Sequence, residues 1–168
     1  MYTRSDARAQ GITLARYAGA RVVIVDDHPT NVALLDRIIR NAGLDGVHAI
    51  TDPRDAVQRC LEIGADLVLL DLHMPHLDGY EVLAALRAAL PPGTFLPIVV
   101  LTGDATIEAR DRALTAGATD FLTKPFDHAE VVLRIHNLLE TRTLYSELQE
   151  HAALLQAHLD ARDEHQRR

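Results

Sequence analysis

Residues 66–75 read Asp-Leu-Val-Leu-Leu-Asp-Leu-His-Met-Pro, an apolar run followed by an acidic residue and, four residues later, by a proline. The run from Asp66 to Leu70 is rich in Val and Leu, which is typical of a strand buried on both faces of a parallel sheet. Similar runs occupy residues 21–25, 46–50, 97–101 and 119–122. They alternate with stretches of helical period, so the sequence predicts an α/β fold with five parallel strands and five helices.

Polar residues stand at the ends of four of these runs. Asp26 and Asp27 follow the first run, Asp71 the third, Thr102 the fourth and Lys124 the fifth. Because the carboxyl ends of parallel strands meet at one edge of a sheet, we expect these side chains to converge. Carboxylates packed together need a compensating cation, which indicates a divalent metal with oxygen ligands. An anion shared between that metal, Lys124 and Thr102 would complete the site.

The motifs around these residues resemble the receiver domain of bacterial two-component response regulators. They are Val25-Asp26-Asp27-His28-Pro29, residues 69–75 with Asp78-Gly79, Leu101-Thr102-Gly103, and residues 121–126. A strand followed by an aspartate is common, whereas all of these motifs in this order are specific. The resemblance extends from about Ala20 to about Leu139. It implies a doubly wound parallel sheet of order 2-1-3-4-5, as in flavodoxin and CheY.

The resemblance also implies a phosphoacceptor and a metal site. Asp71 is the expected phosphoacceptor, a carboxylate that attacks phosphorus and becomes an acyl phosphate. Asp26 and Asp27 are the expected acidic pair for Mg²⁺, completed by Asp71 and by the backbone carbonyl of His73. Magnesium prefers octahedral oxygen ligation and keeps several waters, so a few protein oxygens are enough.

The remaining site residues have expected roles in switching and in phosphoryl lifetime. Lys124 would face the phosphoryl oxygens, and Thr102 would donate a hydrogen bond to one of them. Movement of the threonine would leave space for Phe121, the expected aromatic switch residue, although an ordinary core aromatic is the alternative. The side chains of His73 and Asp104 would flank the phosphoryl group, and we expect them to set the rate of dephosphorylation.

A helical pattern without Gly or Pro continues from Asp127 to about Asp163. It is much longer than the average globular helix of roughly 11 to 12 residues, so its outer part needs a partner. Apolar residues at a and d positions predict a coiled-coil-like homodimer, with packing on the chain's own domain as the alternative. The expected seam comprises Leu138, Tyr145, Leu148, Ala152, Leu155 and Leu159. The expected division is an N-terminal extension at 1–19, a receiver domain at 20–139 and a helical extension or linker at 140–168.

Composition limits the classes of binding partner and the cellular compartment that we expect. The formal net charge of −7, without clustered Lys and Arg, argues against binding of nucleic acid. The single cysteine, Cys60, predicts a reducing compartment. A signal peptide and a membrane span are not expected, so we expect a cytoplasmic protein. The expected partners are a sensor histidine kinase and a second copy of the chain.

Three functional interpretations remain open beside the leading one, in which a receiver catalyses only its own phosphorylation and dephosphorylation. The chain could be the N-terminal receiver and linker of a longer protein with a phosphodiesterase, cyclase or kinase output domain. It could be a constitutive scaffold in which phosphorylation has little effect on the tail. It could also be an aspartate-based phosphatase, but that class needs a second aspartate two residues after the nucleophile, where His73 stands.

Overall fold

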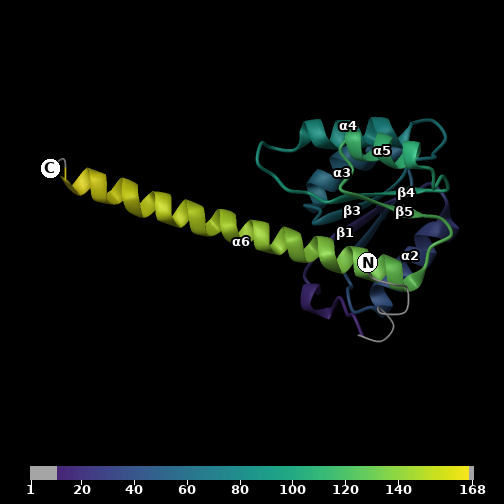
Figure 1. Cartoon of the computed structure of the whole chain (residues 1–168), viewed down its shortest axis with the longest axis horizontal. Helices are drawn as coiled ribbons and strands as arrows, with labels where there is room; N and C mark the ends of the chain where they lie inside the picture. The colour runs from purple at the N-terminus through teal and green to yellow at the C-terminus, as the bar shows by residue number, and fades with distance from the viewer. Residues whose placement is uncertain (1–10, 167–168) are drawn as a thin grey trace.

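A computed structural model describes residues 11–166 of the chain. A parallel sheet forms its centre, with the order β2-β1-β3-β4-β5, and a long helix extends from one side (Figure 1). The strands are β1 (Val22–Val25), β2 (Val47–Ile50), β3 (Leu67–Asp71), β4 (Ile98–Thr102) and β5 (Asp120–Thr123). The predicted α/β fold and strand order are confirmed.

Each strand begins one residue later than we predicted. In addition, Asp71 and Thr102 are the last residues of β3 and β4 and do not follow them. The parallel ladder explains the difference, because the amide of Lys124 donates to the Thr102 carbonyl at 2.8 Å and that of Leu72 to the Leu101 carbonyl at 3.1 Å. The strand hydrogen bonds therefore hold the backbones of both site residues rigidly.

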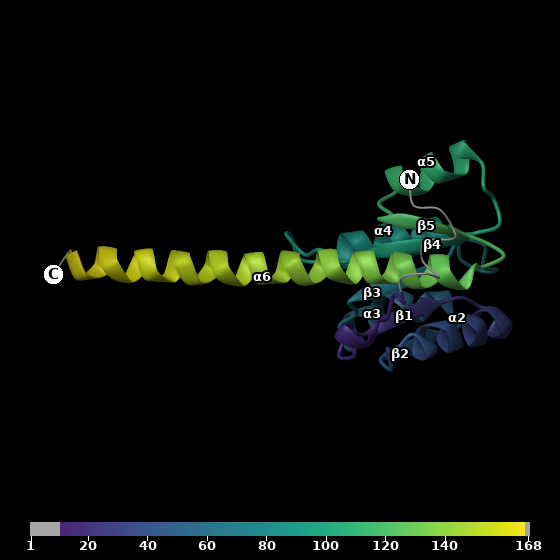
Figure 2. The same ribbon diagram turned by 60° about the horizontal axis from the view of Figure 1, so that its bottom comes forward.

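Helices cover both faces of the sheet (Figures 1 and 2). They are α2 (Pro29–Asn41), α3 (Ala56–Ile63), α4 (Gly79–Ala89), α5 (Ile107–Thr115) and α6 (His128–Gln166), with short 3₁₀ turns η1 (Ala15–Tyr17) and η2 (Pro53–Asp55). Alternate side chains of a strand point to opposite faces. Val23 and Val25 accordingly pack with α3, α4 and α5, whereas Val22 and Ile24 pack with α2, α6 and η1.

The described part of the expected N-terminal extension packs on the domain. Leu14 is fully buried and Tyr17 is 7% exposed. The Leu14 amide donates to the carbonyl of Ala42 at 2.7 Å, and the Tyr17 ring meets His136 edge-on with ring centroids 5.5 Å apart. Residues 11–19 therefore add a layer beside α2 and α6.

The long tail helix that we predicted is present as α6, which has 39 residues. Its first half packs on the sheet, with Val131, Ile135 and Leu139 buried. Its second half extends beyond the domain as a straight rod (Figure 2). Within residues 11–166, none of the helices is both long and apolar enough to cross a membrane.

The single cysteine lies on α3 and packs into the core. Cys60 is 2% exposed, and burial raises the pKa of its thiol to about 12. We expect alkylation of Cys60 by iodoacetamide at neutral pH to be slow, because only the thiolate reacts and the folded state disfavours it. Rapid labelling should appear only when denaturant unfolds the domain, which mass spectrometry would detect. Equal labelling rates with and without denaturant would contradict this burial.

Candidate functional site

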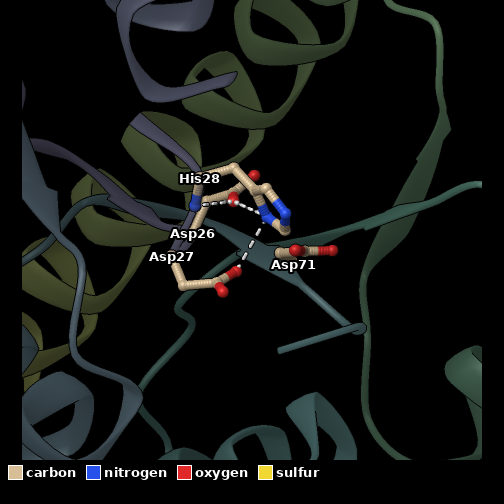
Figure 3. Close-up of side chains that lie close together, drawn as sticks. All are labelled: Asp26, Asp27, His28 and Asp71. Carbon is tan, nitrogen blue, oxygen red and sulfur yellow. Dashed lines mark hydrogen bonds and ion pairs between the residues drawn. The ribbon is translucent and has the colours of Figure 1, made fainter. Parts of the chain in front are cut away.

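Four of the predicted polar groups meet at the carboxyl edge of the sheet. Asp26 and Asp27 follow β1, Asp71 ends β3 and Lys124 follows β5. One ligand atom from each of Asp26, Asp27, Asp71 and the neighbouring His28 lies within 4.8 Å of the others (Figure 3). The expected convergence of carboxylates is therefore present.

Lys124 is the cation of this cluster. Its Nζ lies 3.0 Å from Oδ1 of Asp71 and 3.8 Å from Oδ2 of Asp26. The side chains of Asp26 and Asp71 are almost completely buried, whereas that of Lys124 is 25% exposed. Lys124 thus pairs with two of the three carboxylates, and the cluster holds more negative than positive charge when all three are ionised.

Hydrogen bonding also fixes the backbone of Lys124. Its amide is bonded to β4 as described above, and the Lys124-Pro125 peptide bond is cis. The turn into α6 follows directly, with the Asp127 carboxylate accepting from the Glu130 amide at 3.0 Å. Lys124 therefore lies between a paired strand and a capped helix, which restricts the positions its ammonium can take.

Asp26 is held by two donors that the sequence analysis did not single out. Its Oδ1 accepts from the amide of His28 at 2.8 Å, and its Oδ2 accepts from Nδ2 of Asn31 at 3.0 Å. Both donors come from the start of α2, where Pro29 occupies the first turn. Asn31 lies five residues after Asp26, and the sequence contains no other indication of this contact.

Burial raises the pKa of the Asp26 carboxyl above its ordinary value, and the charge on Asp71 adds to the effect. The bonds from His28 and Asn31 and the charge on Lys124 act in the opposite direction. Burial has the largest effect because it removes the carboxylate from water. The folded structure therefore binds a proton on Asp26 more tightly than an exposed aspartate would.

A pH dependence of metal-free stability follows from this shift. A carboxyl with a raised folded-state pKa binds its proton more tightly when folded, so its contribution is fully present below the unfolded pKa and is lost as pH rises through the folded pKa. In EDTA, the wild type should therefore lose stability relative to Asp26→Asn as pH rises from about 4 toward neutrality. Urea unfolding at several pH values measures this difference. A difference that stays constant with pH would contradict the raised pKa.

Two buried carboxylate oxygens of the cluster have no hydrogen-bond donor, Oδ1 of Asp27 and Oδ2 of Asp71. Nδ1 of His28 approaches Oδ1 of Asp27 at 2.9 Å, but the direction does not suit a hydrogen bond. Unpaired buried oxygens are costly, and a hard cation with oxygen ligands would satisfy both. The donor set therefore fits a small divalent ion.

His73 and Asp104 lie near the acidic cluster and are exposed. The amide of His73 donates to Oδ1 of Asp71 at 3.2 Å. The Asp104 carboxylate accepts from the amide of Thr106 at 2.9 Å, and this bond holds the pKa of Asp104 below its ordinary value. Asp104 thus stabilises the turn before α5, for which Thr106 is the N-cap.

Thr102 is buried at the end of β4, with 4% of its surface exposed. Its hydroxyl oxygen accepts from the amide of Asp104 at 3.0 Å. That bond leaves the hydroxyl proton available, because the Asp104 carbonyl lies at the longer distance of 3.5 Å. A hydroxyl with a weakly engaged proton can donate to a new acceptor in the site.

Phe121 lies on β5 and is partly buried against the core. The guanidinium groups of Arg110 and Arg134 lie 4.8 and 5.9 Å from its ring centroid. Arg134 is held in turn by Asp120 at 2.7 Å. The ring is therefore enclosed by two cations at a surface position, an arrangement that the sequence pattern did not indicate.

The predicted seam residues of the tail divide into two groups. Leu138 packs against the domain's own core, and the Tyr145 hydroxyl donates to the Gly93 carbonyl at 2.8 Å, so these two side chains contact the same chain. The others are exposed, as is Leu144, which the sequence analysis did not include. They are Leu148, Ala152, Leu155 and Leu159. The exposed part of the predicted seam is therefore shorter and begins at Leu148.

Comparisons with known proteins agree with this geometry. The chain is 39% identical over 122 residues to the transcriptional regulatory protein PrrA of Mycobacterium leprae, covering 73% of this chain and 51% of that protein. It is 37% identical over 144 residues to the cyclic di-GMP phosphodiesterase response regulator RpfG of Xanthomonas campestris pv. campestris, covering 84% of this chain and 37% of that protein. The chain thus spans about half the length, or less, of these relatives.

The fold comparison and the family profile give the same result. The structure of chemotaxis protein CheY4 from Vibrio cholerae matches with a TM-score of 0.63 at 28% identity, covering 71% of this chain and 98% of that one. The profile of the response regulator receiver domain matches residues 22–136. The motifs, the strand order and these matches together show that the chain belongs to the response regulator receiver domain family.

Proposed function

We propose that this receiver accepts a phosphoryl group on Asp71 from a sensor histidine kinase. The observation that carries the proposal is the asymmetry of the Asp71 carboxylate, whose Oδ1 is bound by Lys124 while its Oδ2 is buried without a donor. A carboxylate oxygen forms a bond to phosphorus as the bond to the donor's leaving group breaks, and that group departs with the electron pair. The product is an acyl phosphate.

Lys124 and Thr102 are the groups of this chain that would stabilise the product. The ammonium of Lys124 already lies beside Asp71, so it would offset charge that develops on the phosphoryl oxygens. The Thr102 hydroxyl, at the end of the neighbouring strand, would donate to one of those oxygens. Phosphorylation adds roughly −1.5 to −2 charges, and this addition is the signal that Thr102 and Phe121 would convey to the surface of α5, β5 and α6.

The proposed cofactor is Mg²⁺, held by Asp26, Asp27, Asp71 and the backbone carbonyl of His73. When bound, the ion supplies positive charge that offsets repulsion between the carboxylates and the incoming phosphoryl group. Asp27 would bind it most directly, because its side chain is 20% exposed and its Oδ1 has no donor. Asp26 would act mainly through water, because both of its oxygens accept hydrogen bonds from the chain.

Phosphoryl uptake can be tested by intact-mass spectrometry after treatment with a small-molecule phosphodonor and Mg²⁺. We expect the wild type to gain one phosphoryl group and Asp71→Asn to gain none. Asp45→Asn is the control, because the Asp45 side chain is 89% exposed and Asp45 precedes β2, at the edge of the sheet opposite the site. Uptake that persists in Asp71→Asn would refute the proposal.

His73 and Asp104 are proposed to set the phosphoryl lifetime, because each lies two residues after a site residue, Asp71 or Thr102, and is exposed to water. Their imidazole and carboxylate could screen or admit the attacking water. The rate of phosphoryl loss in His73→Ala and Asp104→Ala measures this role. Unchanged half-lives in both variants would remove it.

The proposed output passes through α6 to a second copy of the chain. Leu144, Leu148, Leu155 and Leu159 are 54–66% exposed and recur at spacings of four, seven and four residues. We call them the leucine stripe. These spacings place the four side chains along one side of the helix. An isolated helix of this kind is marginal in water, and burial of the stripe against a second copy would stabilise it.

The leucine stripe can be tested by comparing substitutions in the stripe with a substitution of Leu154, which is next to Leu155 in sequence but lies on a different side of α6. We expect Leu148→Glu/Leu155→Glu to be monomeric in analytical ultracentrifugation, because both charges would lie in the seam. Leu154→Glu should remain dimeric, because Leu154 is equally accessible at 59% exposure but lies off the stripe. A wild type that is monomeric at high concentration would refute the dimer.

The chain could instead belong to a longer protein as its receiver and linker, with residues 20–139 and 140–168 in those roles. RpfG is a cyclic di-GMP phosphodiesterase response regulator and PrrA is a transcriptional regulatory protein, and both are longer than the match. In that case α6 would carry the signal to an output domain of this kind. The leucine stripe would then pair the linkers of two such proteins.

A further inference from the structure

We propose that the connection before β4 forms a clasp for α6, which makes the helix part of the receiver body as far as Gln149 and sets the direction in which it leaves. The clasp consists of Asp66, Gly93 and Phe95 on the domain and Arg142, Tyr145 and Gln149 on the helix. It lies at the amino edge of the sheet, opposite the acidic cluster. Its three helix residues lie beyond residue 136, where the match to the family profile ends.

The contacts converge on two backbone carbonyls. The carbonyl of Gly93 accepts from the hydroxyl of Tyr145 at 2.8 Å and from Nε2 of Gln149 at 3.0 Å. The guanidinium of Arg142 donates to the carbonyl of Phe95, and the rings of Phe95 and Tyr145 lie 5.5 Å apart. The three helix residues follow at spacings of three and four, so they share one side of α6.

Asp66 ties the clasp to the sheet. Its Oδ1 lies 3.1 Å from Nε of Arg142, and its Oδ2 accepts from the amide of Arg21 at 2.8 Å. The side chains of Arg142 and Asp66 are 23% and 20% exposed, so solvent screens this ion pair less than a fully exposed one. Because Arg21 precedes β1 and Asp66 precedes β3, the helix is anchored to two interior strands of the sheet.

The connection between α4 and β4, residues 90–97, is suited to this role because its backbone is restricted. Pro91 and Pro92 have fixed φ angles, and the amide of Thr94 closes a turn to the Pro91 carbonyl at 3.1 Å. Gly93 has a φ of 80°, in the left-handed region that favours glycine. The backbone therefore presents the Gly93 carbonyl in a fixed position.

The clasp selects which side of α6 remains for other contacts. At 3.6 residues per turn, the leucine stripe lies roughly 100° around the helix from the side of Arg142, Tyr145 and Gln149. Among the described residues, the side-chain hydrogen bonds from α6 to the domain end at Gln149. A free rod therefore begins near residue 150, with the stripe turned away from the clasp. This consequence for pairing rests on the proposed dimer, whereas the clasp itself does not.

Hydrogen–deuterium exchange of the full chain, dilute and without phosphodonor, tests the clasp independently of phosphorylation and dimerisation. In Arg142→Met/Tyr145→Phe, amides in 140–149 and in the 93–95 connection should exchange about tenfold faster than in the wild type. Gln149→Ala should show a smaller change of the same kind. Gln156→Ala is the matched control and should leave both segments unchanged, because Gln156 bonds only to Asp160 on its own helix.

The exchange rates of residues 93–95 and 140–149, taken together, decide whether the clasp exists. Faster exchange in both supports the clasp, because these side chains supply the hydrogen bonds between the two segments. Unchanged exchange in the double variant would overturn the proposal. Faster exchange in 140–149 without any change in 93–95 would also overturn it, since lost helix propensity alone would explain that pattern. None of these outcomes depends on phosphoryl uptake.

Discussion

Replacement of Gly79 by alanine is expected to destabilise the domain by about 3 kcal/mol, the upper part of the usual range for overpacking. Gly79 is buried at the start of α4. A Cβ at this position would lie 2.5 Å from both the Asp71 carbonyl oxygen and the Cα of Leu72. Those atoms belong to the backbone at the end of β3, so the clash cannot be relieved by rotating a side chain. The end of β3 or the start of α4 must move.

This change would also disturb the site, because the clash involves the backbone of Asp71. We therefore expect Gly79→Ala to take up phosphoryl groups more slowly than the wild type. Urea unfolding measures the stability, and intact-mass spectrometry measures the uptake. Gly19→Ala is the matched control, because a Cβ at Gly19 meets no atom within 4 Å. Equal stability of the two variants would contradict the tight approach of α4 to β3.

Magnesium should stabilise the folded protein, since a ligand that binds only the native state shifts the unfolding equilibrium. At about a hundred times the dissociation constant, the gain is about 2.7 kcal/mol. Asp27→Asn should lose most of this gain, because it removes the charge beside the unpaired Oδ1 that we propose as the direct ligand. Removal of the ion with EDTA should return the wild type to its metal-free stability.

Thermal unfolding with and without MgCl₂, at matched ionic strength, measures this effect. Asp45→Asn again serves as the control and should keep the full response to the ion. Stabilisation of equal size in the wild type and in Asp27→Asn would show that Mg²⁺ does not bind through Asp27. No stabilisation in either protein would contradict a metal site at this edge of the sheet.

The sequence alone could predict the fold and most of the acidic cluster because both depend on strand periodicity. Buried parallel strands appear as continuous apolar runs, and the residues at their carboxyl ends must converge. The convergence of Asp26, Asp27, Asp71 and Lys124 follows from that rule, whereas their expected roles come from the resemblance to receiver domains. The ends of β3 and β4 lie one residue later than predicted because hydrophobicity does not reveal that the ladder hydrogen bonds continue through Asp71 and Thr102.

Contacts that do not follow from strand or helix periodicity could not be predicted in this way. Asn31 binds Asp26 only because the first turn of α2 folds back over the site. Tyr145 has the spacing of a seam residue, but its hydroxyl finds a carbonyl 52 residues earlier in the chain. Periodicity shows which residues share a side of a helix, not whether its own domain or another chain covers that side.

The most direct test of the account is the chemical location of the phosphoryl group. Acyl phosphates are reduced by borohydride to the corresponding alcohol, so a phosphorylated aspartate becomes homoserine, which tandem mass spectrometry can locate. We predict homoserine at position 71 alone after treatment with phosphodonor and Mg²⁺. Homoserine at Asp26 or Asp27 instead, or a stable phosphoryl group on any other residue with Asp71 unmodified, would contradict the assignment of Asp71 as the phosphoacceptor.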